Sequence, residues 1–386
     1  MTDLGIVLTI SSPYLTFIPG MAILFVLSEK KVPIYLNPLN TGLFLLFVWA
    51  FIAGIVNMSI ISTIASLGLL LHWCLAVYLQ DTLQEEKSVS LFLAKVWRFS
   101  LFTALLGIVE KIASYFFDLT WIASYYLNDP IEYVYRIYST YGNPNVAGGW
   151  FAAMIILTFY FFEHDNYQNK RKYLFYLLSF LTALVFSGSR GATLALEAAL
   201  LSYALLSKNK TTRTVIFSTF FLIIILAVLS PEINYNHPLN SRFPIWLKSF
   251  KLFLEKPFLG WGIFGILAQT KKIHTHNIWF TILTMLGVVG FSLYLWIKYY
   301  IYKSLILLYN NKQQLVPLLV AMQVFMVTHG VVDFIIMTPQ GGVMFFATAA
   351  ITVGLARSYE INPELELAEA WRIVKTGLSD TKSIKG

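Results

Sequence analysis

Residues 231–277 are the part of this sequence whose residue types are best suited to chemistry. They interrupt an otherwise apolar second half, carry six Lys or Arg against two acids, and end in His274-Thr275-His276-Asn277. A histidine, whose ordinary pKa is near 6.5, can take a proton from a hydroxyl group. Arginine binds phosphate oxygens through paired N–H groups. The segment is therefore suited to acid–base chemistry on an anionic ligand.

Within this segment, Arg242 opens a stretch whose apolar residues recur at helical spacing until Pro257. Lys248 and Lys251 lie between the apolar positions, which predicts an amphipathic helix at a membrane surface. The field of the two lysines would also attract an anion. His274 and His276 lack a third ligand at a recognisable spacing, so we expect no metal site.

Two further groups outside this segment are candidates. Arg190 lies in a tight turn, 187–192, where it could anchor to lipid headgroups or hold a phosphate. His329 and Asp333 are four residues apart in an apolar run, which predicts that they share one helical face. Ionisable groups inside a membrane span are functional candidates by default, although a mutually satisfied structural pair is the alternative.

The elements that must position these residues are membrane-spanning helices. Of the 386 residues, 57% are hydrophobic and only 12% are charged, about half the charge of a soluble domain. We predict an all-α polytopic membrane protein with about 11 (10–12) spans and one large extracytoplasmic loop. The spans are predicted at 4–27, 41–57, 59–79, 97–117, 146–162, 173–187, 191–206, 214–230, 277–297, 315–337 and 341–356. Pro13 and Pro19 predict a kink or break in the first.

The basic residues predict the orientation of the chain. With segment 29–40 inside, the inner segments hold nineteen Lys or Arg and the outer ones eight, six of them in loop 231–276. This predicts a transmembrane domain over 1–357 and a cytoplasmic tail over 358–386 with a short amphipathic helix. The net charge of +8 is then explained by the cytoplasmic borders of the spans, and nucleic acid is not an expected partner.

Four short motifs occur in a recognisable order on the outer face: GNPNVAGG (142–149), SGSRGA (187–192), SRFPIW with the trailing KPFLGWGIFG (241–265), and HTHN (274–277) followed by Gly287. Together they resemble the O-antigen ligase / O-antigen polymerase superfamily of bacterial membrane glycosyltransferases, over roughly residues 130–340. The resemblance implies a site on the outer face of the bacterial cytoplasmic membrane. It implies an undecaprenyl-diphosphate-linked glycan donor, a glycan or lipid A-core acceptor, and no cofactor.

The resemblance also implies roles for individual residues. Arg190 and Arg242 would neutralise the leaving diphosphate, and His276 would be the general base for an acceptor hydroxyl in an inverting, metal-independent transfer. Residues expected to contact substrate are Asn143, Asn145, Lys248, Lys251, His274, Asn277, His329 and Asp333.

Two alternatives remain open on the sequence. A polymerase needs the same residues as a ligase, and Gly290 stands where one ligase pattern has Thr or Val; SGSRGA and HTHN favour the ligase-like description. A transporter of lipid-linked glycan would carry charges within several spans and often internal repeats. The predicted spans are nearly free of charge, which disfavours transport.

Overall fold

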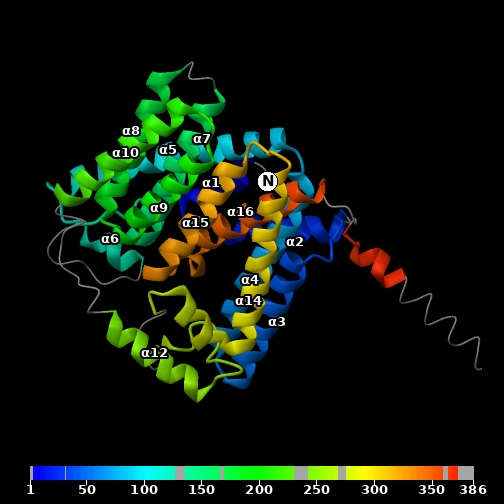
Figure 1. Ribbon diagram of the computed structural model, residues 1–386. Coiled ribbons are helices and arrows are strands. Elements are labelled where there is room, and N and C mark those ends of the chain that lie inside the picture. Colours follow the sequence, from blue (N-terminus) through cyan, green and yellow to red (C-terminus); the bar gives the residue numbers. More distant parts are fainter. Residues whose placement is uncertain are drawn as a thin grey trace, which may run out of the picture.

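The computed structural model describes residues 3–30, 32–126, 135–165, 169–229, 242–267, 275–359 and 364–372. These residues form helices joined by turns, with one isolated β-bridge between Tyr35 and Glu366 and no strand (Figure 1). The prediction of an all-α chain is confirmed for this part of the protein.

The helices, in chain order, are α1 (Asp3–Ser11), α2 (Phe17–Glu29), α3 (Pro38–Val56), α4 (Ile60–Thr82), α5 (Glu86–Ala113), α6 (Thr120–Tyr125), α7 (Pro144–His164), α8 (Lys170–Ser187), α9 (Arg190–Leu206), α10 (Lys210–Leu229), α12 (Phe243–Glu255), α14 (Ile278–Asn310), α15 (Val316–Val332), the 3₁₀ helix η2 (Ile335–Met337) and α16 (Pro339–Arg357). Some helices follow one another directly, whereas longer connections separate α6 from α7 and α12 from α14.

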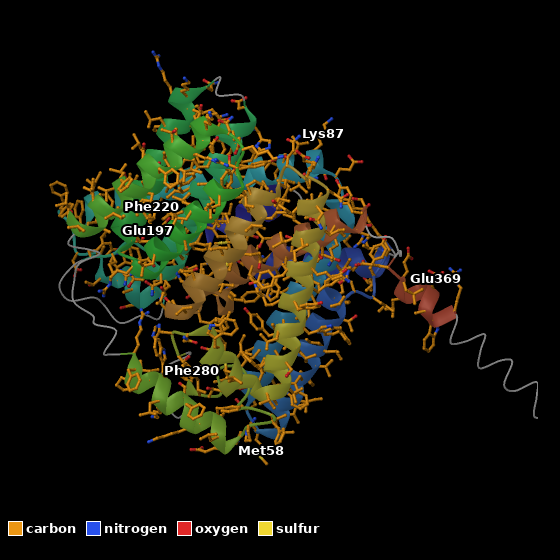
Figure 2. All side chains as sticks on the ribbon, in the orientation of Figure 1. Met58, Lys87, Glu197, Phe220, Phe280 and Glu369 are labelled. Atoms are coloured by element: carbon orange, nitrogen blue, oxygen red, sulfur yellow. The ribbon has the colours of Figure 1, made fainter. Side chains whose placement is uncertain are left out.

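Several of these helices match the dimensions of a bilayer. Among the described residues, seven are long and apolar enough to cross a membrane: α3, α4, α5, α7, α10, α14 and α16. Two shorter helices, α2 and α15, are also apolar. The chain is therefore a multi-span membrane protein, while the predicted total of about 11 spans stays a prediction. Figure 2 shows Met58 and Phe280 toward one end of the molecule and Lys87 toward the other.

Two predicted spans are interrupted in the structure. The first is broken into α1 and α2 around Pro13, as its prolines indicated, while Pro19 lies in the first turn of α2, where its missing N–H is tolerated. The span predicted at 315–337 is wrong in extent. It ends at Val332, because Asp333 adopts an extended backbone with φ −155° and ψ 177°.

The most buried helices are α7 and α16, whose apolar windows are 83% and 89% buried. Close packing against α7 depends on its glycines. A Cβ added at Gly148 would lie 2.5 Å from the Cβ of Ser189, in the turn before α9. Small residues thus let α7 and α9 approach closely, as is common between membrane helices.

Helix α14 is broken at Gly287, whose φ of 63° and ψ of −169° are accessible essentially only to glycine. The carbonyl of Met285 accepts a hydrogen bond from the N–H of Gly262 at 2.7 Å, and the N–H of Val288 donates to Pro257 at 2.8 Å. The indole of Trp49 donates to the carbonyl of Leu286 at 2.8 Å. Segment 257–262 therefore fills the break and satisfies its backbone, as an irregular helix at membrane depth requires.

The amphipathic helix predicted after Arg242 is present as α12, which packs against α14. In Figure 1, α12 lies at the same end of the molecule as the start of α14. At the carboxyl end of the chain, Leu367 begins a helical stretch that the structure describes as far as Arg372. The Asn362 cap and Pro363 start predicted for the tail helix lie outside the described residues.

Candidate active site

The starts of four helices meet the end of α15 at residues 331–333. Asn145, in the first turn of α7, donates its amide to Asp333 at 2.6 Å, and Arg242, the cap of α12, donates to the carbonyl of Val332. Asn277, the cap of α14, donates to the carbonyl of Val331 at 3.0 Å. A Cβ at Gly191, in the first turn of α9, would lie 2.9 Å from Val332. Because helix starts carry partial positive charge, their convergence favours an anion.

Asp333 is the carboxylate around which this site is built. Its side chain is only 6% exposed. One oxygen, Oδ1, accepts from the N–H of Phe334 at 2.8 Å and lies 3.2 Å from Nδ1 of His276, while Oδ2 accepts from Asn145. The carboxylate is thus fixed by partners from three separate parts of the chain.

His276 is held in an orientation suited to a general base. Its backbone is left-handed, with φ 55°, and its side chain is 30% exposed. An ionised carboxylate only accepts hydrogen bonds, so Nδ1 of His276 carries the proton that faces Asp333. The lone pair of the neutral ring is then on Nε2, which is the atom that can take a proton from a substrate.

Arg136 is a site residue that the sequence analysis missed. Its Nε donates to the carbonyl of Ser187 at 2.7 Å, and its Nη2 donates to Oδ1 of Asn145 at 2.6 Å. Asn145 is thereby the link between Arg136 and Asp333. Burial lowers the pKa of Arg136 to about 10; Asp333 opposes this shift, and the charges of Arg190 and Arg242 add to it. The only sequence signal was a positive charge in an outward-facing segment.

The positive charges of Arg190 and Arg242 lie close enough to influence one another's surroundings, beside Asp333. Burial lowers the pKa of the half-buried Arg242, the carboxylate of Asp333 raises it, and the positive charge of Arg190 lowers it further. Arg190 is exposed as the first residue of α9, directly after the Ser189 cap. Because the charge of Arg190 reaches Arg242, the two guanidinium groups together create a positive potential that an anionic ligand would relieve.

His329 and Asp333 do not share a helical face, so that prediction is wrong. The backbone N–H of Asp333 donates to the carbonyl of His329 at 2.8 Å, after which the chain leaves the helix. The buried ring of His329 has no hydrogen-bond partner among the described residues. Gly149 and Gly191 lie beside the ring, since a Cβ at either position would be in van der Waals contact with its Nε2, at 4.0 or 3.7 Å.

Other predicted site residues have structural partners. Asn143 caps α7 by accepting from the N–H of Asn145 at 2.8 Å, and Asn277 caps α14 by accepting from Trp279 at 2.9 Å. Lys248 and Lys251 lie exposed on α12. His274 lies outside the described residues.

The indole groups of the loop also have structural partners. Trp246 donates to the carbonyl of Thr275 at 3.1 Å, and Trp261 donates to Leu252 at 2.8 Å. The first of these bonds ties α12 to the residue before His276, so the loop helix and the histidine are positioned together.

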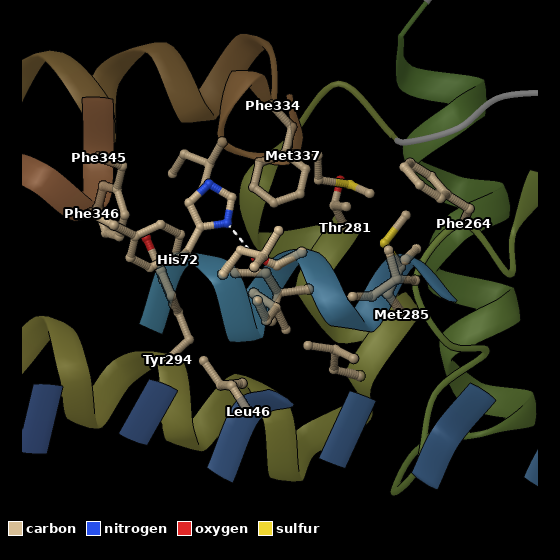
Figure 3. A pocket seen from close by; sticks show the side chains of 18 of the residues that line it. Leu46, His72, Phe264, Thr281, Met285, Tyr294, Phe334, Met337, Phe345 and Phe346 are labelled. Carbon is tan, nitrogen blue, oxygen red and sulfur yellow. Dashed lines mark hydrogen bonds between the residues drawn. The ribbon is translucent and has the colours of Figure 1, made fainter. Parts of the chain in front are cut away.

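An apolar cavity of about 430 Å³ begins beside the site (Figure 3). Ile278 and Phe334, which line it, directly follow Asn277 and Asp333. Figure 3 shows aromatic and aliphatic side chains from α4, α14 and α16 around the ring of His72, whose Nδ1 bonds to the carbonyl of Gly68 at 2.6 Å. Leu67, on the cavity wall, is 44% exposed. The cavity is suited to a long apolar chain.

Comparison with known proteins gives one family. Residues 174–295 match the family model described as O-antigen ligase, a stretch that includes Arg190, Arg242 and His276. Arg136, Asn145 and Asp333 lie outside the matched stretch. No curated protein matches the chain. The family match confirms the resemblance that the four motifs indicated.

Proposed function

Since residues 174–295 match the O-antigen ligase family model, we propose that this chain is a glycosyltransferase acting on lipid-linked glycans. It transfers a glycan from undecaprenyl diphosphate to an acceptor hydroxyl at the outer face of the bacterial cytoplasmic membrane. The observation that carries the proposal is the meeting of four helix starts with Arg190 and Arg242 beside the His276–Asp333 pair.

The arginines deal with the leaving group. In this reaction the acceptor oxygen bonds to the anomeric carbon, and the bond from that carbon to the diphosphate oxygen breaks. Negative charge then builds on the departing diphosphate. Arg190 and Arg242 bind and neutralise this charge through bidentate hydrogen bonds. The helix starts add fixed partial charges of the same sign.

His276 and Asp333 deal with the acceptor. A sugar hydroxyl is a weak nucleophile, and Nε2 of His276 takes its proton as the new bond forms. Asp333 keeps the ring oriented through Nδ1 and stabilises the imidazolium that results. Direct displacement inverts the anomeric carbon. We propose that Arg136 and Asn145 position Asp333, through the bond from Arg136 to Asn145 and the bond from Asn145 to Asp333.

The apolar cavity supports a lipid-linked donor. Its lining side chains come from membrane helices, and it reaches the site at Ile278 and Phe334. A polyprenyl chain lying there would place its diphosphate near the helix starts. Because the arginines supply the positive charge, the scheme uses neither a metal ion nor another cofactor.

The test is an assay with purified protein in detergent. One undecaprenyl-diphosphate-linked repeat unit is supplied as both donor and acceptor, and products are resolved on a gel. Transfer that appears only after lipid A-core or another acceptor is added supports the ligase reaction; a ladder of chain lengths makes the protein a polymerase. Either activity should be lost in His276→Ala. No transfer with any acceptor overturns the proposal.

A further inference from the structure

A second groove, of about 650 Å³, lies along the far part of α14. Its residues on that helix recur every three or four positions and so share one face. The start of α3 and the chain after α16 complete it. The groove is lined by, among others, Leu36, Trp296, Tyr300, Lys303, Ser304, Ile306 and Glu364.

This groove is remote from the candidate active site. Asn277 caps the first turn of α14, whereas Ser304 lies on the segment beyond the break at Gly287, about 24 Å past Val288 along a helix that rises 1.5 Å per residue. That segment alone covers most of the roughly 30 Å of a bilayer's hydrocarbon core. The groove therefore lies at the opposite membrane boundary and belongs to neither reactant of the proposed transfer.

The base of the groove holds an unused hydroxyl. Ser304 is 2% exposed, and its Oγ has no hydrogen-bond partner among the described residues. Leaving a buried hydroxyl unpaired is unfavourable, so a ligand oxygen or nitrogen at this point would be stabilised. The exposed ammonium of Lys303, the adjacent residue, lies at the same groove.

Glu364, the carboxylate among the described residues that line the groove, is already compensated. Glu364 accepts from Nε of Arg357 at 3.1 Å and from the hydroxyl of Tyr300 at 2.6 Å. Asn37 donates to the same carboxylate at 3.0 Å. Lys303 therefore sets the sign of the charge that the groove presents to a ligand.

The wall formed by the chain after α16 is fixed in place. The N–H of Leu36 donates to Leu365 at 2.9 Å, and that of Leu367 donates to Ile34 at 2.8 Å. Arg357 also stacks on the ring of Tyr35, 3.5 Å from its centroid. The groove is thus a built feature of the fold.

The rim of the groove is apolar and exposed. Trp296 is 39% exposed, Leu36 41% and Ile306 61%. Tryptophan at a membrane boundary favours the level of the lipid headgroups, and its neighbours here offer a surface for an acyl chain. A cation and a hydroxyl below an apolar rim match an anionic phospholipid, with its phosphate inside and a chain along the rim.

We propose that this groove binds the headgroup of an anionic phospholipid from the leaflet at that boundary. The ammonium of Lys303 pairs with the phosphate, and the Ser304 hydroxyl donates to a phosphate or ester oxygen. Such a lipid would join α14, α3 and the chain after α16 at the end opposite the candidate active site.

Native mass spectrometry of the purified full-length protein tests this proposal. The delipidated protein is titrated with phosphatidylglycerol and, separately, with phosphatidylcholine. We expect a saturable phosphatidylglycerol adduct that phosphatidylcholine does not reproduce. Lys303→Gln and Ser304→Ala should each weaken this adduct several-fold. Lys312→Gln, which removes the same charge from the same end of α14 but outside the groove, is the matched control and should leave it unchanged.

Three outcomes would overturn the proposal. Equal adducts with both lipids would show that the groove does not select charge. An equal loss in Lys312→Gln would assign the effect to general surface charge. Displacement of the lipid by an equal concentration of glycerol phosphate would make a free phosphate ester the ligand. Thermal melts of Lys303→Gln, a change at an exposed position, confirm that binding is measured on folded protein.

Discussion

Oδ1 of Asp333 lies 3.2 Å from Nδ1 of His276, although the two residues are 57 positions apart in the chain. One follows the end of α15 and the other precedes the start of α14. The pairing depends on two irregular stretches of backbone, the left-handed conformation of His276 and the extended one of Asp333. A left-handed conformation such as that of His276 is maintained only where the surrounding structure determines it, and such conformations occur often at functional sites.

Removing the imidazole should abolish transfer without unfolding the protein. We expect His276→Ala to lower the transfer rate by about 100-fold to 10,000-fold, the usual contribution of a general base. The rate is measured with saturating lipid-linked donor. His164→Ala is the matched control, since His164 ends α7 in the structure and its ring bonds only to the backbone of Tyr160 among the partners shown. Equal activity in wild type and His276→Ala would contradict the assigned role.

Exchanging the two linked side chains should separate stability from catalysis. Asn145→Asp places a second carboxylate 2.6 Å from Oδ2 of Asp333, so we expect a loss of about 1–3 kcal/mol in the free energy of unfolding. In the double variant Asn145→Asp/Asp333→Asn, an amide again faces a carboxylate, and stability should recover. Transfer should not recover, because His276 then lacks its carboxylate.

The stability of Asn145→Asp and of the double variant is measured by thermal melting, and the transfer rate is measured on the same preparations. Asp333→Asn alone gives the reference for catalysis without the negative charge. If the double variant recovered both stability and activity, the role of Asp333 would be structural only, and the proposed pairing with His276 would be wrong.

Because of Arg136, the free energy of unfolding should depend on pH in the alkaline range. Its pKa is about 10 in the folded protein, below the ordinary value of about 12.5, so both states keep the proton below about pH 10. Above that pH the folded chain releases the proton while the unfolded chain retains it, so the contribution of Arg136 to the free energy of unfolding rises with pH. The difference in Tm between wild type and Arg136→Met should be constant from about pH 7 to 9 and shift in favour of wild type above about pH 10. A difference that shifted the other way would contradict this.

Gly287 should not tolerate a side chain. A Cβ there would lie 2.1 Å from the carbonyl oxygen of Phe258, in a backbone conformation that other residues rarely adopt. We expect Gly287→Ala to destabilise the protein by at least about 2 kcal/mol and to lower transfer, because the loop bearing α12 docks at this break. The control is Gly68→Ala in α4, where an added Cβ meets nothing within 4 Å. If Gly287→Ala and wild type had the same Tm, glycine at the break would not be needed for stability, and the prediction would be wrong.

The sequence predicted the chemical groups of the candidate site better than their arrangement. Arg190, Arg242 and His276 stand out because charge and imidazole are rare in so apolar a chain. The pairing of Asp333 was not predictable, because no proline or other local signal marks the end of α15 and four-residue spacing then implies one helical face. Arg136 was missed for a related reason, since its importance comes from Ser187 and Asn145, which only the tertiary structure brings to it.

The role of the glycines at 260–265 also depends on the tertiary structure. Gly260-Trp261-Gly262-Ile263-Phe264-Gly265 resembles a nucleotide-binding pattern, but no strand and helix of the required kind surround it. The structure shows what these residues do, because Gly260 and Gly262 have positive φ and carry the chain into the break of α14. These residues therefore form a segment that docks into the break of α14.

The break in α14 also divides this helix into two segments of unequal length. Residues 278–286 make a helical segment only about 14 Å long, too short to cross a bilayer, whereas residues 288–310 extend about 35 Å and can. The first segment receives its backbone partners from residues 257–262, so the start of α14, and Asn277 and His276 before it, depend on a segment that comes earlier in the chain.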